Sequence, residues 1–260
     1  ETDQHDSTLL LMIFSKKHDS TDDLDAVDKR FRQQASWTIA FQQRVLSLLP
    51  NRKINILEVG CGTGSFLCSL QSIRNSADIH WVGLDIAYDR LAYAQQRIIA
   101  DWVNGDGMVL PFPAETFDLV ICHYLLLWLK RPCQVLTEMK RVARLGGWIV
   151  ATAEPDYLSR IDYPDRFVDA GKAQTEALRA MGANPQAGRE LPNLFHSAGM
   201  EDPLFGIHGT EYQGDEYQNF LEEESRQLKN DIGNGKTIET TIGRVFYVPT
   251  FYAIYQKWSK

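Results

Sequence analysis

The sequence has no long apolar run near its start. The longest one there is LLLMIF at 9–14, six residues, whereas a helix that spans a bilayer needs about 20. No basic segment precedes this run and no small-residue cleavage site follows it. We therefore expect neither a membrane anchor nor a signal peptide.

Positive charge and paired cysteines are also scarce. Lys and Arg total 27 against 34 Asp and Glu, a formal net charge of −7, and no long basic run is present to neutralise a phosphate backbone. We therefore expect no nucleic-acid partner. The four cysteines contain no C-x-x-C pair, and Cys61 and Cys122 fall in segments predicted to be buried. This usage is typical of a reducing, cytoplasmic setting, and the spacing of histidines and cysteines predicts no metal site.

Short apolar runs alternate with helical periodicity from residue 54 onward. With 260 residues, 44% of them hydrophobic, the chain is large enough for one sizeable core but too short for two full-sized domains. Nearly continuous apolar runs between helices indicate a parallel sheet covered on both faces. The strands are expected at INILEV, WVGLDI, WVNGD, DLVICHY and WIVATAE, with later ones at 204–209 and 248–258. Helices are expected from Ser65, over 88–101, 132–144, 165–182, 191–200 and 215–230, and 155–166 is expected to be a loop.

Three alternating glycines follow the first of these strands, in ILEVGCGTGSF at 56–66. Glycine tolerates positive φ and has no Cβ, so a strand that turns on Gly60, Gly62 and Gly64 into a helix brings backbone close to a ligand. A dinucleotide fingerprint starting at Gly60 would require glycine at 65, where this chain has Ser65. The turn therefore predicts a nucleotide-like ligand and disfavours a pyrophosphate.

Two acids follow the next strands. Asp85 ends the second predicted strand, 25 residues beyond Gly60, where one carboxylate can accept hydrogen bonds from both hydroxyls of a ribose. Asp106 follows the third strand, beside Met108, and is placed to meet an adenine amino group. Either acid alone is as well explained by a turn or a helix cap, but the two together after the glycine turn favour a nucleoside site.

Four segments together resemble class I S-adenosylmethionine-dependent methyltransferases. They are LEVGCGTGSF, VGLDIA, GDGMVLPFPAETFDLVICHYLLLWL and LKRPCQVLTEMKRVARLGGWIVATAEP. The resemblance is to the small-molecule group that includes the ubiquinone and menaquinone biosynthesis methyltransferases, and it covers residues 31–155 in detail. It implies S-adenosyl-L-methionine as cofactor and a small organic acceptor.

The resemblance also implies roles for individual positions. Around the cofactor it places, from the methionyl part to the adenine, Glu58, Gly60, Cys61, Gly62, Gly64, Asp85, Ile86, Asp106, Gly107, Met108, Cys122 and His123. Phe31 and Trp37 are similar in position to residues that fold over the cofactor in relatives, although both are equally well explained as core aromatics of a helix.

The implied fold is α/β, a doubly wound, mostly parallel seven-stranded sheet with N-terminal helices and a helical lid insertion. A flexible leader is expected over 1–28 and a single methyltransferase domain over 29–260. Within it we expect a helical cap (29–50), a cofactor-binding core (51–155), a helical lid for the substrate (156–200) and C-terminal strands with a helix (201–260).

Candidates for the chemistry come from the ends of the fourth and fifth strands. His123 is the first candidate base, and Asp156 and Tyr157 follow the fifth strand beside Glu154. Local packing and turn chemistry are competing explanations for these residues. Arg189 is a candidate for an anionic group, with a surface ion pair as the alternative. The expected function is methyl transfer to oxygen, nitrogen or carbon. An S-adenosylmethionine-binding protein with a regulatory role is the main alternative, since fold does not fix function.

Overall fold

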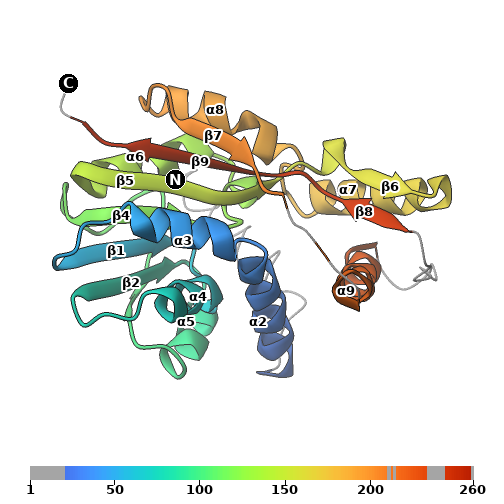
Figure 1. The fold of residues 1–260 in the computed structure, drawn as a ribbon, viewed down its shortest axis with the longest axis horizontal. Helices are drawn as coiled ribbons and strands as arrows, with labels where there is room; N and C mark the ends of the chain where they lie inside the picture. The colour runs from blue at the N-terminus through green and yellow to red at the C-terminus, as the bar shows by residue number, and fades with distance from the viewer. Residues whose placement is uncertain (1–20, 210–211, 213–214, 233–243, 259–260) are drawn as a thin grey trace, which may run out of the picture.

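The computed structural model describes residues 21–209, 212, 215–232 and 244–258. Its centre is a seven-stranded sheet in the order β3-β2-β1-β4-β5-β9-β7 (Figure 1). The first five strands along the chain run parallel, and β9 runs antiparallel between β5 and β7. The bounds are β1 (Ile54–Val59), β2 (Ile79–Asp85), β3 (Asp101–Asn104), β4 (Phe117–Cys122), β5 (Ala143–Pro155), β7 (Leu204–Ile207) and β9 (Thr250–Gln256). The expected doubly wound, mostly parallel sheet is confirmed.

Helices cover both faces of this sheet because successive side chains along a strand point to opposite sides. Ile56 and Leu119 pack into the core shared with α3 and α4, whereas Leu57 and Val120 pack into the core shared with α6 and α8. The covering helices are α3 (Ile39–Ser47), α4 (Ser65–Ile73), α5 (Tyr88–Gln95), α6 (Pro132–Val142) and α8 (Ala187–Ser197).

A small lobe lies beyond the end of the sheet, on the right of Figure 1. It consists of α7 (Val168–Ala180), α9 (Asp215–Ile232) and a two-stranded antiparallel ribbon of β6 (Ile161–Tyr163) and β8 (Val245–Tyr247). The helix α7 contacts both α9 and β6. The lobe thus joins part of the expected insertion to a segment near the C-terminus.

Several boundaries differ from the sequence-based ones. The expected insertion 156–200 is divided, because α8 packs on β5, β9 and α6 and so belongs to the sheet. The segment expected to be loop contains β6 and two 3-10 turns, η2 (Tyr157–Ser159) and η3 (Asp165–Phe167). The helix expected over 88–101 ends at Gln95, and Asp101 already begins β3.

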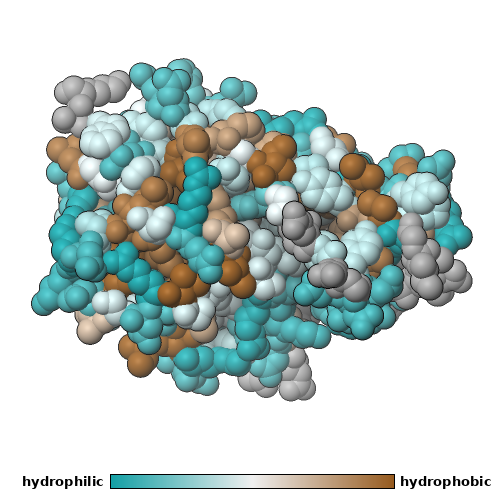
Figure 2. Space-filling view, viewed as in Figure 1, coloured by the Kyte–Doolittle hydropathy of each residue, from teal (hydrophilic) through white to brown (hydrophobic). Residues whose placement is uncertain are grey.

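The N-terminal helix starts earlier than expected. α2 (Thr21–Ser36) begins inside the segment 1–28 that the sequence assigns to a leader, and the first 20 residues lie outside the described part of the chain. Figure 2 shows a mostly hydrophilic surface where α2 lies. The opposite side of α2 packs on α4, and this contact brings α2 to the glycine turn.

Candidate active site

The glycine turn joins the end of β1 to α4 through three residues of positive φ. The φ values are 74° at Gly60, 52° at Gly62 and 77° at Gly64, a region that residues with a Cβ adopt at a cost. The N–H groups of Gly60 and Cys61 both donate to the carbonyl of Leu84, at 2.7 and 3.0 Å. The turn is thereby fixed to the end of β2.

Side chains from distant segments approach the turn closely. A Cβ built on Gly60 would lie 2.6 Å from Leu125, and one built on Gly62 would lie 2.7 Å from Phe31. Real Cβ atoms essentially never make contacts this short, so a larger residue at either position would have to displace the neighbouring side chain as well as adopt an unfavourable positive φ. Phe31, expected from the resemblance to cover the cofactor, therefore lies over the turn.

Asp85 connects the turn to the loop after β2. One carboxylate oxygen accepts from the N–H of Gly62 at 2.7 Å, and the other accepts from the N–H of Ala87 at 2.8 Å. A carboxylate oxygen can accept two hydrogen bonds, so each keeps capacity for one hydroxyl. This geometry fits a ribose with two neighbouring hydroxyl groups.

Glu58 is buried on β1 just before the turn. Burial, with a further contribution from Asp85, raises the pKa of its carboxyl group well above the ordinary value, while the N–H of Leu67 opposes the shift. Its Oε2 atom is buried and has no hydrogen-bond partner among the described residues. A buried unsatisfied oxygen beside a glycine turn fits the amino group of a methionyl moiety.

The loops after β2 and β3 are tied together at the expected adenine edge. The side-chain amide of Asn104 donates to the carbonyls of Asp85 and Ile86, at 3.1 and 2.9 Å. One oxygen of Asp106 accepts from the N–H of Met108 at 2.8 Å, which closes a turn around Gly107. The structure therefore brings Ile86, which is exposed, and the Asp106 segment to one edge of the sheet.

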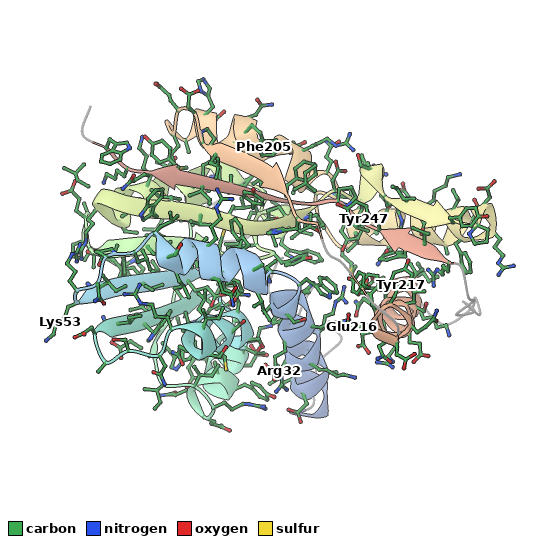
Figure 3. All side chains as sticks on the ribbon, in the orientation of Figure 1. Arg32, Lys53, Phe205, Glu216, Tyr217 and Tyr247 are labelled. Atoms are coloured by element: carbon green, nitrogen blue, oxygen red, sulfur yellow. The ribbon has the colours of Figure 1, made fainter. Side chains whose placement is uncertain are left out.

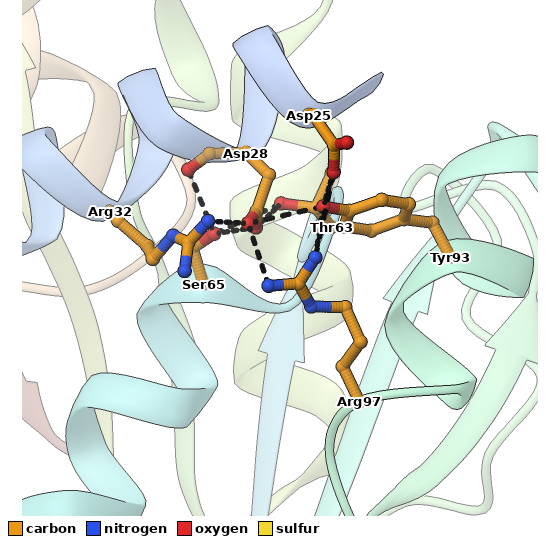
Figure 4. A network of polar contacts seen from close by, with 7 residues as sticks. All are labelled: Asp25, Asp28, Arg32, Thr63, Ser65, Tyr93 and Arg97. Carbon is orange, nitrogen blue, oxygen red and sulfur yellow. Dashed lines mark hydrogen bonds and ion pairs between the residues drawn. The ribbon is translucent and has the colours of Figure 1, made fainter. Parts of the chain in front are cut away.

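Asp28 of α2 is a residue that the sequence did not single out, and Figure 4 shows its contacts. Its Oδ1 accepts from the hydroxyls of Thr63 and Ser65, at 2.9 and 2.6 Å, and its Oδ2 pairs with Arg32 at 2.6 Å. Asp28 is 4% exposed. It fastens α2 to the glycine turn, and no motif in the sequence indicates this, because the partners lie 35 and 37 positions away.

A cavity opens at the carboxyl ends of β4 and β5, between the sheet and the lobe. Tyr157 and Trp37, both singled out from the sequence, are among its lining residues. The others are Arg30, Thr38, Tyr124, Pro155, His208, Tyr212, Phe220, Glu224, Phe246, Tyr247, Val248 and Thr250. In Figure 3, Tyr247 lies where β8 runs back toward the sheet, and its hydroxyl donates to the carbonyl of His208 at 3.1 Å.

Two charged residues on the cavity wall pair with each other. Arg30 of α2 forms an ion pair with Glu224 of α9 and contacts the face of Trp37 at 5.0 Å. Burial opposes the charge on Arg30, but Glu224 raises its pKa above the ordinary value. The acidic run LEEES at 221–225 is typical of a solvated helix face, but Glu224 within it is only 5% exposed.

His123 follows β4, as expected, but its side chain is buried against Phe66 and Thr152. Its ring stacks on Phe66 at 4.2 Å, and its Nδ1 lies 2.8 Å from the hydroxyl of Thr152. Burial, with a smaller contribution from His208, lowers the pKa of His123 to about 3. His123 is not among the described residues that line the cavity, and neither is Cys122, which is fully buried in the core.

The acids at the end of β5 and just after it are engaged in structural contacts. Glu154 accepts from the N–H groups of three successive residues, 125–127, at the start of η1 (Leu126–Trp128). Burial nevertheless raises the pKa of Glu154 to about 7. Asp156 accepts two hydrogen bonds from Arg189, at 2.5 and 2.8 Å. This pair favours the ion-pair explanation of Arg189 and leaves Asp156 as a structural link between η2 and α8, so we do not retain it as a base.

The remaining groups of chemical interest are the cysteine thiols and the potential metal ligands. Burial raises the pKa of the Cys61 and Cys122 thiols well above the ordinary value, which keeps both protonated. All four cysteines are unpaired. Among the residues that the structure describes, no group of three or more His, Cys, Asp or Glu side chains is arranged to hold a metal ion.

Comparison with known proteins identifies the family. The family described as "Methyltransferase domain" matches residues 57–151. A demethylmenaquinone methyltransferase of Bacillus licheniformis is 30% identical over 209 residues, which cover 73% of this chain and 87% of that protein. The chain belongs to the S-adenosylmethionine-dependent methyltransferases. It is an enzyme of this family and uses S-adenosylmethionine. The buried Oε2 atom of Glu58, which has no hydrogen-bond partner among the described residues, and the closely packed glycine turn fit this cofactor.

One further relative and one solved structure are similar to this methyltransferase. An uncharacterized methyltransferase of Schizosaccharomyces pombe is 32% identical over 149 residues, but the match covers only 52% of each protein. A chain from the complex between the Haloferax volcanii Trm112 methyltransferase activator and a methyltransferase has a TM-score of 0.59 at 14% identity, covering 89% of this chain and 95% of that one. No helix among the described residues of the methyltransferase is long and apolar enough to cross a membrane.

Proposed function

We propose that the enzyme methylates a small organic molecule bound in the cavity at the carboxyl ends of β4 and β5. The observation that carries this proposal is that residues adjacent in sequence contact the cavity and the glycine turn. Arg30 and Tyr124 line the cavity, while the residues that follow them, Phe31 and Leu125, lie against the glycine turn. An acceptor in the cavity would thus be separated from the cofactor by little more than the width of one side chain.

Tyr124 has a backbone conformation that supports a functional role for this junction. Its φ is 51°, which costs a non-glycine residue about 1–2 kcal/mol, and residues strained in this way cluster at active sites and ligand-binding segments. Its N–H donates to the carbonyl of Ala153 at 3.0 Å. The loop after β4 is thereby held against β5 with Tyr124 on the cavity wall.

The cofactor is proposed to lie along the glycine turn. Glu58 with Gly60, Gly62 and Gly64 would hold the methionyl part, Asp85 the ribose, and the loops containing Ile86 and Asp106 the adenine. When bound, S-adenosylmethionine supplies a methyl carbon that is already activated by a positive sulfur. The chain then has to align the acceptor and exclude water, a role that we assign to Phe31 and Trp37 of the N-terminal segment.

The structure suggests a revised division of the domain. We propose residues 21–50 as the helical cap, where the sequence predicts 29–50, and residues 51–155 as the cofactor-binding core, the same bounds as the sequence predicts. The acceptor-binding lobe would consist of 156–182 together with 215–232 and 244–247. The unpaired cysteines support a reducing, cytoplasmic setting, and the net charge of −7 supports a partner other than nucleic acid.

The proposal is tested by incubating the enzyme with a metabolite extract and methyl-labelled S-adenosylmethionine. Mass spectrometry should find the label in the fraction of low molecular mass, together with S-adenosylhomocysteine. Label confined to proteins or nucleic acids in an unfractionated lysate would contradict a small acceptor. Binding of the cofactor without transfer to any fraction would favour the regulatory alternative.

A further inference from the structure

His208, which the sequence did not single out for catalysis, lies at the functional edge of the sheet. β5 and β7 both pair antiparallel with β9, so they run in the same direction, and Glu154 and Ile207 pair with the same residue, Phe251. His208 is the first residue after β7. It therefore projects from the carboxyl-end edge at which the cavity opens, and its ring is part of the cavity wall.

An irregularity in β5 fixes the orientation of the His208 ring. The pairing of β5 with β9 shifts register between Ala151 and Glu154, and the carbonyl of Thr152 within this shift lies 2.6 Å from Nε2 of His208. A carbonyl oxygen can only accept, so Nε2 carries a hydrogen. In the neutral ring the lone pair is then on Nδ1, the nitrogen that a proton acceptor needs.

The surroundings of His208 favour the neutral ring. It is half-buried, with Phe41 at 5.0 Å and Tyr252 at 5.1 Å between ring centroids. Burial lowers the pKa of His208 below the ordinary value, although the contact with Thr152 opposes the shift. His123, the first candidate from the sequence, also contacts Thr152 but lies beneath Phe66. Of the two histidines, His208 is the one exposed to the cavity.

The cavity wall is aromatic and has no unpaired charge. Its charged side chains among the described residues are Arg30 and Glu224, which neutralise each other. An anionic or cationic acceptor would have to break this pair or leave its own charge uncompensated. Planar rings would pack well against the seven aromatic side chains Trp37, Tyr124, Tyr157, Tyr212, Phe220, Phe246 and Tyr247.

We propose that the acceptor is an uncharged planar molecule that reacts through a hydroxyl group, and that His208 is its general base. The inference rests on the proposed function. The hydroxyl proton goes to Nδ1 of His208, and the oxygen forms a bond to the methyl carbon. The carbon–sulfur bond breaks with its electron pair going to sulfur. The products are a methyl ether and neutral S-adenosylhomocysteine, and the imidazolium then loses its proton to water.

The tautomer is tested without any activity measurement. Long-range ¹⁵N–¹H NMR spectra of the ligand-free enzyme, assigned with His208→Gln, should show a hydrogen on Nε2 and none on Nδ1 of His208 at neutral pH. A hydrogen on Nδ1, or a doubly protonated ring, would overturn the assignment of His208 as base.

The acceptor class is tested with three naphthalene probes and labelled cofactor: 2-naphthol, 2-naphthoic acid and 2-naphthylmethylamine. We expect transfer to 2-naphthol, with at most traces on the other two, and calorimetry should detect 2-naphthol binding before cofactor is added. Preferred transfer to the acid or the amine would overturn the inference. Labelled products from a metabolite extract that are all acids or amines would also overturn it, yet leave the proposed function standing. Failure of every extract to accept label would instead remove the proposed function.

Two histidine variants separate catalysis from structure. His208→Gln keeps a donor for the carbonyl of Thr152 but has no basic nitrogen, and should slow transfer to 2-naphthol by about 100-fold with unchanged cofactor affinity. The loss should shrink to a few-fold with a nitro-substituted naphthol, whose more acidic hydroxyl depends less on a base. His196→Gln, on the exposed end of α8, is the matched control and should be within twofold of wild type. An equal loss on both naphthols would mean that His208 is structural.

Discussion

The contact between α2 and the glycine turn predicts a large effect of removing Asp28. Its Oδ1 accepts hydrogen bonds from two buried hydroxyls, Thr63 at 2.9 Å and Ser65 at 2.6 Å, and a hydrogen bond to a charged group contributes about 1.5–3 kcal/mol. The two hydroxyls lie 3.0 Å apart and can pair with each other in the variant. We therefore expect Asp28→Ala to lower the free energy of unfolding by about 3 kcal/mol, the low end of the sum.

A second variant at the same position separates the hydrogen bonds from the ion pair. Asp28→Asn keeps an oxygen that can accept from both hydroxyls but loses the attraction to Arg32 and the longer one to Arg97, at 2.6 and 3.7 Å from Oδ2. Because the Arg32 side chain is 54% exposed, solvent screens that pair, and it should contribute at most about 1 kcal/mol. Asp28→Asn should therefore destabilise the protein much less than Asp28→Ala.

Urea unfolding followed by circular dichroism measures both variants. Asp169→Ala is the control, since Asp169 is an exposed acid in the first turn of α7 and should change the free energy of unfolding by less than about 0.5 kcal/mol. The reasoning is refuted if Asp28→Ala behaves like the control, because α2 would then not be fastened to the turn through this carboxylate. Equal losses for Asp28→Ala and Asp28→Asn would instead assign the effect to the ion pair.

Three further predictions concern the cofactor site and its surroundings. Asp85→Ala should weaken S-adenosylmethionine binding at least tenfold, about 1.4 kcal/mol; unchanged affinity by calorimetry would remove the ribose assignment. Gly62→Ala should lower the thermal midpoint and the cofactor affinity together, because its φ is 52° and its Cβ would lie 2.7 Å from Phe31; a wild-type midpoint would show that Phe31 does not cover the turn. The pKa of His123 falls from an ordinary 6.5 to about 3 in the folded state, so only the unfolded chain gains this proton below pH 6.5. Stability should therefore be lost as pH falls, by up to about 1.4 kcal/mol per pH unit, and a His123→Gln variant with the same slope in urea titrations would contradict this.

The sequence could predict the parts of the fold that depend on local pattern. Continuous apolar runs between helices gave the parallel sheet, and the alternating glycines gave the turn, because a positive φ at Gly60 and Gly62 has a direct signature in residue type. Asp85 could be singled out for a similar reason, since it ends a strand at a fixed distance from the turn.

What could not be predicted depends on contacts between distant segments. β6 and β8 are three residues each and pair across more than 80 positions, so neither has a periodic pattern of its own. Asp28 looked like one charge among many in a polar segment, and Glu224 looked like one acid of a solvated run. His208 was passed over because its importance comes from the direction of β7 and from the irregular pairing of β5, which no local pattern records.

The most direct test of the central claim is a crystal structure of the full chain with S-adenosylhomocysteine. The account predicts that the ribose hydroxyls donate to the two oxygens of Asp85 and that the amino group lies against Oε2 of Glu58. The sulfur should then face the cavity lined by Tyr124 and His208. A ribose bound away from Asp85, or a sulfur directed away from that cavity, would contradict it.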